Sequence, residues 1–121
     1  SPAIEMPSVG YENHAGRTHL GACVEPFGEV ISSTGHGNND TDKRDGIRYK
    51  QIVGTYLHGP LLAKNPLVAD DLLSRALVRY ARRMEAQGQA LSDAYTVSPL
   101  NDAEERGANE AMCAKLGVRG L

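Results

Sequence analysis

The sequence predicts an α/β fold in which a strand-rich first part precedes two helices that cover the strands. The composition changes near residue 58, from Gly, Thr, Val and Ile punctuated by turns to Ala, Leu, Arg and Glu. Apolar residues then recur in steps of three and four from position 69 to position 84, which is the spacing of one helical face. A chain of 121 residues is long enough for one domain and too short for two.

Four short strands are expected before residue 58, at 17–24, 28–33, 47–49 and 51–57. Pro26 separates the first two, because proline fits poorly inside a paired strand. The segment 34–46 is expected to be a polar loop, and its closing turn leads into the third strand. The fourth strand should be the more deeply buried one, because its apolar residues do not alternate strictly with polar ones.

The clearest predicted element is a helix that begins at Asn65-Pro66 and ends near Gly88. Asn65 is expected to cap the first free N–H groups, and Pro66 to occupy the first helical position. Asp71 and Arg75 are spaced for an ion pair one turn apart.

A second helix is expected to dock at the C-terminal end of the chain. Asp102 and Glu105 form a capping-box pattern at its start, and Gly117 is a plausible stop. Its apolar face is weak and consists of Ala103, Ala108, Ala111, Met112 and Leu116.

Charge and composition exclude several classes of function. With 13 Lys and Arg against 15 Asp and Glu, the net charge is −2, so the chain lacks the basic surface that broad nucleic-acid binding needs. No apolar run approaches the ~18 residues of a membrane span, and the first five residues do not resemble a signal peptide. Cys23 and Cys113 make no disulfide framework, which favours a reducing, cytoplasmic compartment. Leu, Ile, Val and Phe account for 25 of the 121 residues, a thin core for a free-standing domain.

His58 is the strongest candidate for chemistry. It follows the predicted strand 51–57 and precedes Gly59, where open α/β sheets place active-site groups. Histidine accepts and returns protons near neutral pH. A structural histidine bonded to a carbonyl is equally consistent with this position.

Two motifs carry a family resemblance: GTYLHGPLLAKNP at Gly54–Pro66, which contains His58, and GYENHAGRT at Gly10–Thr18. The first resembles the histidine motif of class I glutamine amidotransferases of the cobyric-acid-synthase type. It is closest to one branch of them, the glutaminase subunit of lipid II isoglutaminyl synthase. The second is similar to a Gly-aromatic-Glu-x-His-x-Gly segment that lies upstream in this family. The resemblance covers residues 10–81.

The resemblance implies glutamine hydrolysis by a Cys-His mechanism, with His58 as general base and acid. Ammonia would pass to a Mur-ligase-like synthetase that amidates the D-glutamate of lipid II in peptidoglycan synthesis. ATP and metal are expected on that partner, with no cofactor and no metal in this chain. Amidation of a corrin ring, as in cobyric acid synthase, and a non-catalytic binding module with the same fold are the alternatives.

The family's nucleophile lies at a tight Gly-x-Cys-x-Gly-like elbow, which neither Cys23 nor Cys113 matches. Residues 1–121 are therefore expected to be the C-terminal half of a flavodoxin-like amidotransferase domain with a mixed sheet. The nucleophile would be on the missing N-terminal half, and the fragment alone should be inactive. Many class I members carry Glu two positions after the histidine, where this chain has Pro60. Glu12 is the candidate to orient His58, and a hydrogen bond from its carboxylate to the backbone is the alternative.

The pattern formed by His14, His19 and Cys23 could suggest zinc. Residues five apart on a strand face opposite sides, so the two histidines should diverge. Structural zinc usually takes four ligands. Ordinary polar positions are therefore expected here. A dyad of Cys23 with His58 is disfavoured because no elbow surrounds the cysteine.

Overall fold

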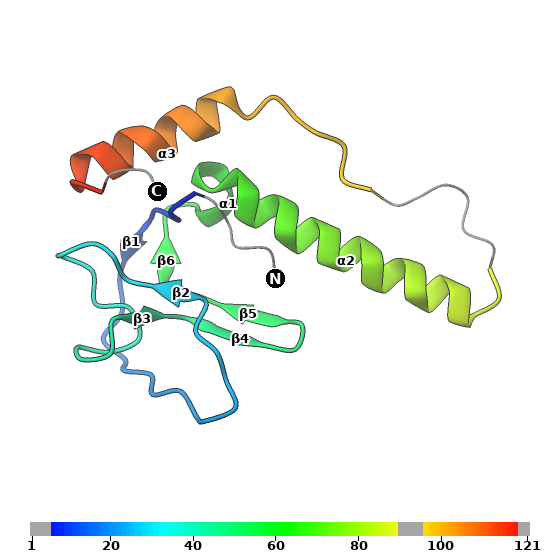
Figure 1. Ribbon diagram of the computed structural model, residues 1–121, viewed down its shortest axis with the longest axis horizontal. Helices are drawn as coiled ribbons and strands as arrows, with labels where there is room; N and C mark the ends of the chain where they lie inside the picture. The colour runs from blue at the N-terminus through cyan, green and yellow to red at the C-terminus, as the bar shows by residue number, and fades with distance from the viewer. Residues whose placement is uncertain (1–5, 90–95, 119–121) are drawn as a thin grey trace.

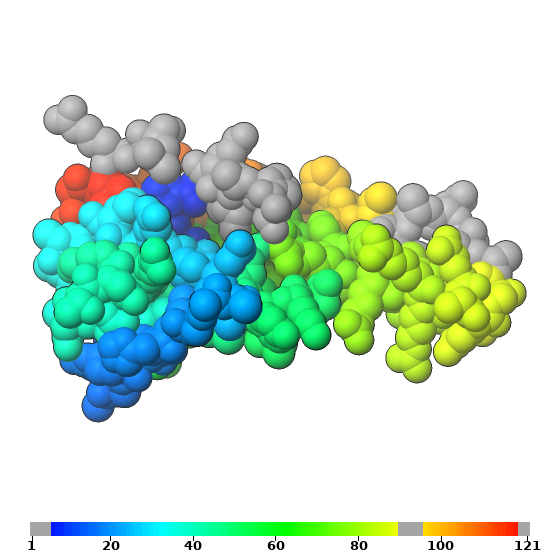
Figure 2. All heavy atoms as spheres, turned by 60° about the horizontal axis from the view of Figure 1, so that its bottom comes forward, coloured from blue at the N-terminus to red at the C-terminus, as the bar shows by residue number. Residues whose placement is uncertain are grey.

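The computed structural model describes residues 6–89 and 96–118, and it shows a mixed α/β arrangement (Figure 1). The strands are β1 (Tyr11–Glu12), β2 (Gly28–Glu29), β3 (Arg44–Asp45), β4 (Ile47–Tyr49), β5 (Ile52–Gly54) and β6 (Leu57–His58). The helices are α1 (Leu61–Lys64), α2 (Pro66–Ala86) and α3 (Ala103–Lys115). In the space-filling view, α2 forms an arm that extends well beyond the strands (Figure 2).

The strands form three separate antiparallel pairs, β1 with β6, β2 with β3 and β4 with β5. Within the described residues, these pairs replace the single mixed sheet that the sequence predicts. β3 continues through Gly46 (φ +65°) into β4, and the chain reverses at Lys50 (φ +53°) between β4 and β5. β4 has partners on both edges, because Arg48 also forms an isolated antiparallel bridge to Glu25.

The predicted strand 17–24 does not form, and the predicted strand 28–33 shortens to β2. Pro26 separates the two predicted strands, because proline has no N–H group to donate to a neighbouring strand. The backbone N–H of Thr18 donates to the carbonyl of Asn38 at 2.7 Å, in the polar loop. The segment therefore packs on that loop and not on a neighbouring strand.

The predicted strand 51–57 is divided into β5 and β6, because the chain turns to bind a buried carboxylate. Asp45 accepts a hydrogen bond from the backbone N–H of Tyr56 at 3.1 Å and another from the hydroxyl of Thr55. Ile52 is 60% exposed, so the expectation of a deeply buried strand is wrong. The bend leads directly into His58.

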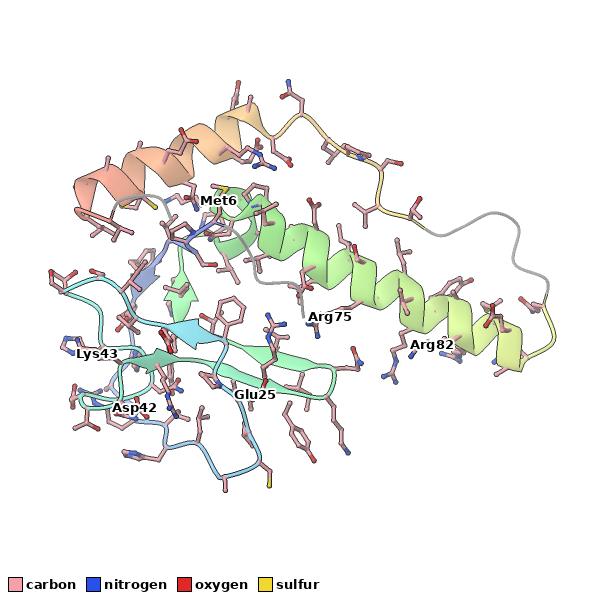
Figure 3. All side chains as sticks on the ribbon, in the orientation of Figure 1. Met6, Glu25, Asp42, Lys43, Arg75 and Arg82 are labelled. Atoms are coloured by element: carbon pink, nitrogen blue, oxygen red, sulfur yellow. The ribbon has the colours of Figure 1, made fainter. Side chains whose placement is uncertain are left out.

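α2 confirms the predicted helix, with Pro66 at its first position and left-handed Gly88 (φ +72°) just beyond its end. The predicted ion pair is present, with Asp71 Oδ2 3.0 Å from Arg75 Nε. The same oxygen lies 3.7 Å from Arg48 Nη1 and so links α2 to β4. Arg75 lies on the side of α2 that is turned toward the strands (Figure 3). No helix in the described ranges has both the length and the apolar character needed to cross a bilayer.

Asn65 does not cap α2 with its side chain, contrary to the prediction. Instead, its Oδ1 accepts from Val9 N at 2.7 Å and its Nδ2 donates to Val9 O at 2.8 Å. Asn109 of α3 donates to the carbonyls of Pro7 and Lys64, both at 2.9 Å. These two buried asparagines therefore fasten the N-terminal segment, the start of α2 and α3 to one another.

α3 confirms the second predicted helix but not its cap or its buried face. The side chain of Asp102 makes no capping bond, and Asn101 Oδ1 accepts from Ala103 N at 3.3 Å. The buried residues are Asn109 and Cys113, whereas the alanines of the predicted face are exposed. An asparagine bonded to backbone carbonyls occupies the centre of this contact, which apolar periodicity does not detect.

The apolar core is small, as the composition predicts. Among the described residues, the buried hydrophobic side chains are Val9, Val68 and Cys113. They lie near the asparagine pair, where the N-terminal segment, α2 and α3 meet. Several large apolar side chains along α2 stay about half exposed: Leu73, Val78 and Tyr80.

Candidate active site

His58 lies on β6 directly opposite Tyr11 of β1. The two residues are partners in the antiparallel pair, and their rings stack with centroids 5.4 Å apart and planes 19° apart. His58 is nevertheless exposed in this chain. Its imidazole is therefore held against an aromatic ring and still accessible to a reacting group.

Two glycines allow this close approach of β1 and β6. A Cβ at Gly59 would lie 2.6 Å from Cε1 of Tyr11, and the residue has φ +101°, a conformation that other residues adopt at a cost. A Cβ at Gly10 would lie 2.7 Å from the carbonyl oxygen of His58. A side chain at Gly10 would therefore crowd the backbone of β6, and one at Gly59 would displace the Tyr11 ring.

Glu12 leaves the strand on the opposite side from Tyr11, because successive side chains of a strand alternate. Its carboxylate accepts from the backbone N–H of His36 at 3.1 and 3.2 Å and from that of Gly37 at 3.0 Å. It also lies 3.6 Å from Nε2 of His14. The structure thus gives Glu12 the alternative backbone role, and it does not bring the carboxylate to His58.

The two motifs of the sequence fold against each other. The ring of His14 stacks on Tyr56, with centroids 3.7 Å apart and planes 12° apart. The hydroxyl of Tyr56 lies 2.6 Å from Oγ1 of Thr18. The segment Gly10–Thr18 therefore supports the chain that runs into His58.

Sequence reasoning did not select three residues that shape this site: Tyr11, Asp45 and Tyr56. Both tyrosines lie inside the quoted motifs, so the motifs themselves contained the signal. The sequence identifies Asp45 only as a turn residue before Gly46. Its second role, which is to hold the bend before β6, requires burial and long-range contacts that a local pattern does not contain.

Neither cysteine is placed to act as a nucleophile for His58. Cys23 is exposed in the segment before β2, and Cys113 is buried in α3, with Sγ 3.5 Å from Oδ1 of Asn109. Burial raises the pKa of the Cys113 thiol, which disfavours the reactive thiolate. Both thiols are free, and neither is hydrogen-bonded to His58.

The histidines and the exposed cysteine of the possible zinc pattern do not form a metal site. Within the residues that have described positions, no group of three or more His, Cys, Asp or Glu side chains could hold a metal ion. His14 instead stacks on Tyr56, and its Nδ1 lies 3.0 Å from the carbonyl oxygen of Gly16.

A groove of about 990 Å³ opens between α3 and the strands β1 and β2. Its apolar lining includes Phe27, Val30, Ile31, Leu57, Met112 and Leu116. Tyr11 also lines the groove, whereas His58 does not. The groove therefore comes close to β1 without including the imidazole.

Residues 3–66, which include both motifs and His58, match the profile of the CobB/CobQ-like glutamine amidotransferase domain. The GatD subunit of lipid II isoglutaminyl synthase (glutamine-hydrolyzing) from Staphylococcus aureus is 51% identical over 72 residues, covering 59% of this chain and 28% of that protein. The same subunit from Streptococcus pneumoniae is 43% identical over 68 residues, covering 56% and 25%. A cobyric acid synthase from Chlorobium chlorochromatii is 31% identical over 87 residues, covering 69% and 16%. The chain thus spans about a quarter of the length of its GatD relatives.

Proposed function

Because the chain belongs to the CobB/CobQ-like glutamine amidotransferase family, we propose that it supplies the histidine of a glutaminase active site. A thiolate attacks the carboxamide carbon of glutamine, ammonia leaves, and water hydrolyses the remaining γ-glutamyl thioester to glutamate. His58 accepts the proton of the thiol and delivers it to the departing ammonia. The observation that carries this proposal is an accessible His58 at the end of β6, within the matched family segment.

The thiol and the oxyanion hole are assigned to the missing N-terminal half of the same domain. Three observations support this assignment: neither cysteine is hydrogen-bonded to His58, the buried core is small, and a large apolar groove lies open. Relatives about four times as long as the matched segment have the chain length to supply that half. Each oxyanion donor is worth roughly 2.7–4 kcal/mol of barrier, so this chain alone should not turn over glutamine.

The identities of 51% and 43% to GatD subunits favour lipid II as the acceptor. Ammonia would pass to a Mur-ligase-like synthetase that uses ATP to activate the D-glutamate carboxylate of lipid II, and ATP and metal would bind there. Ammonia released into water is protonated and lost, so the chemistry favours a tight complex of the two proteins, which we place in the cytoplasm as part of this proposal. The 31% identity to a cobyric acid synthase supports the corrin ring as the alternative acceptor.

Glutamate release from glutamine by the complete amidotransferase tests the proposal. His58→Ala should abolish this release, whereas His19→Ala, which changes an exposed histidine outside the strands, should retain it. Release that survives in His58→Ala would refute the catalytic role. No release by the unsubstituted enzyme with its synthetase partner would favour the non-catalytic module. Supplying D-glutamate-containing lipid II or a corrin as acceptor separates the two amidation reactions.

A further inference from the structure

We propose that Tyr11 is the positioning residue for His58, an inference that rests on the proposed glutaminase function. A catalytic imidazole must hold one ring nitrogen toward the thiol and then toward the leaving group. Within this chain, the position two residues after His58 is Pro60, which has no group that could orient the ring. Glu12 is bound to backbone N–H groups on the other face of the strand.

The stacking of Tyr11 on His58 supplies the orienting contact that Pro60 and Glu12 do not provide. Tyr11 and His58 are direct partners across β1 and β6, so their side chains leave the same face of the pair. Their planes are within 19° of parallel. Rotation of the imidazole about its χ2 angle would break this parallel contact, so the tyrosine fixes the plane in which both ring nitrogens lie.

The position of the tyrosine ring is itself fixed by its contact with Gly59. Its Cε1 and Cδ1 pass over Gly59, so closely that a Cβ there would lie 2.6 and 2.7 Å away. Gly59 follows His58 directly, and the ring is therefore packed against the backbone of the residue next to the one it positions. Tyr11 is also 59% exposed, so its ring contributes little to the core.

Steady-state kinetics of the complete amidotransferase test the inference. Tyr11→Leu should lower kcat for glutamine hydrolysis about tenfold to a hundredfold, because a misplaced catalytic group costs up to about that much, with KM changed by less than about twofold. Tyr11→Phe keeps the ring and should recover at least about a third of kcat. Tyr49→Leu changes another exposed tyrosine, on β4, and serves as the matched control at the original rate.

NMR spectra of the same variants, prepared with carbon-13-labelled histidine, give a readout that does not depend on turnover. The His58 ring protons, assigned from the signal lost in His58→Ala, should be shifted upfield by the tyrosine ring. The shift should persist in Tyr11→Phe. An unshifted His58 signal in the unsubstituted enzyme would overturn the inference even if Tyr11→Leu fails to fold.

Two kinetic results would also overturn it: an unchanged kcat in Tyr11→Leu, or a Tyr11→Phe variant as slow as Tyr11→Leu. His58→Ala, measured in parallel, separates this failure from that of the proposed function. An inactive His58→Ala with a fully active Tyr11→Leu refutes positioning alone. An active His58→Ala refutes both.

Discussion

Replacing Asn65 by alanine should destabilise the protein and loosen the strand pair that holds His58. Asn65 is 3% exposed, and its side chain makes hydrogen bonds to Val9 N at 2.7 Å, to Val9 O at 2.8 Å and to Leu61 O at 2.6 Å. Val9 comes two residues before Tyr11 in the chain. Asn65 therefore sets the position from which β1 starts toward β6.

Asn65 Oδ1 also accepts from Asn109 Nδ2 at 3.2 Å, so the side chain makes four hydrogen bonds that alanine removes. A net contribution of about 1 kcal/mol for each bond gives a loss of about 4 kcal/mol. Alanine also leaves the N–H and C=O of buried Val9 without this partner, and one unsatisfied buried group costs roughly 1–3 kcal/mol. The free energy of unfolding should therefore fall by about 4 kcal/mol or more. At about 2–4 °C for each kcal/mol, a loss of about 4 kcal/mol shifts Tm by roughly 8–16 °C in a domain of some 200 residues.

Thermal unfolding of the complete amidotransferase, followed by circular dichroism at one pH and ionic strength, measures this loss. Asn101→Ala is the matched control, because Asn101 is exposed and makes a single bond of 3.3 Å to Ala103 N. That variant should lose less than about 1 kcal/mol. Equal shifts in Tm for Asn65→Ala and Asn101→Ala would refute the reasoning.

Gly59→Ala should lower both stability, by about 1–3 kcal/mol, and glutamine turnover, because its Cβ meets the Tyr11 ring and its φ is +101°. Gly107→Ala in α3, where a Cβ meets nothing within 4 Å, should leave turnover intact and raise Tm, and equal losses would contradict the account. In native protein, iodoacetamide should modify exposed Cys23 well before Cys113, since burial raises the pKa of the Cys113 thiol. Peptide mass spectrometry measures both rates, and equal rates would show that Cys113 is not buried in the native protein.

Local patterns were sufficient for the long helix and insufficient for the strands. α2 is predictable because its apolar spacing, Pro66 and Gly88 all lie within one continuous segment. The strand prediction fails around Thr55 because the partner that turns the chain there, Asp45, is ten positions earlier. A side chain that bonds across such a distance overrides the local preference for an extended chain.

The same limit applies to the site. The motif identifies His58, but the register that places Tyr11 opposite it depends on a strand pair formed by segments far apart in the chain. Asn65 shows that a residue type can suggest one role while long-range contacts give it another. Its residue type suits a helix cap, and its actual partner, Val9, lies 56 positions away. Residue type alone does not distinguish these roles.

His58 is proposed to serve a thiol located outside these 121 residues. Alkylation of the complete amidotransferase by a chloroketone analogue of glutamine, mapped by peptide mass spectrometry, tests it most directly. The modified cysteine should lie outside this segment, and modification should slow markedly in His58→Ala, where the thiol has lost its base. Modification of Cys23 or Cys113, or an unchanged rate in His58→Ala, would contradict the claim.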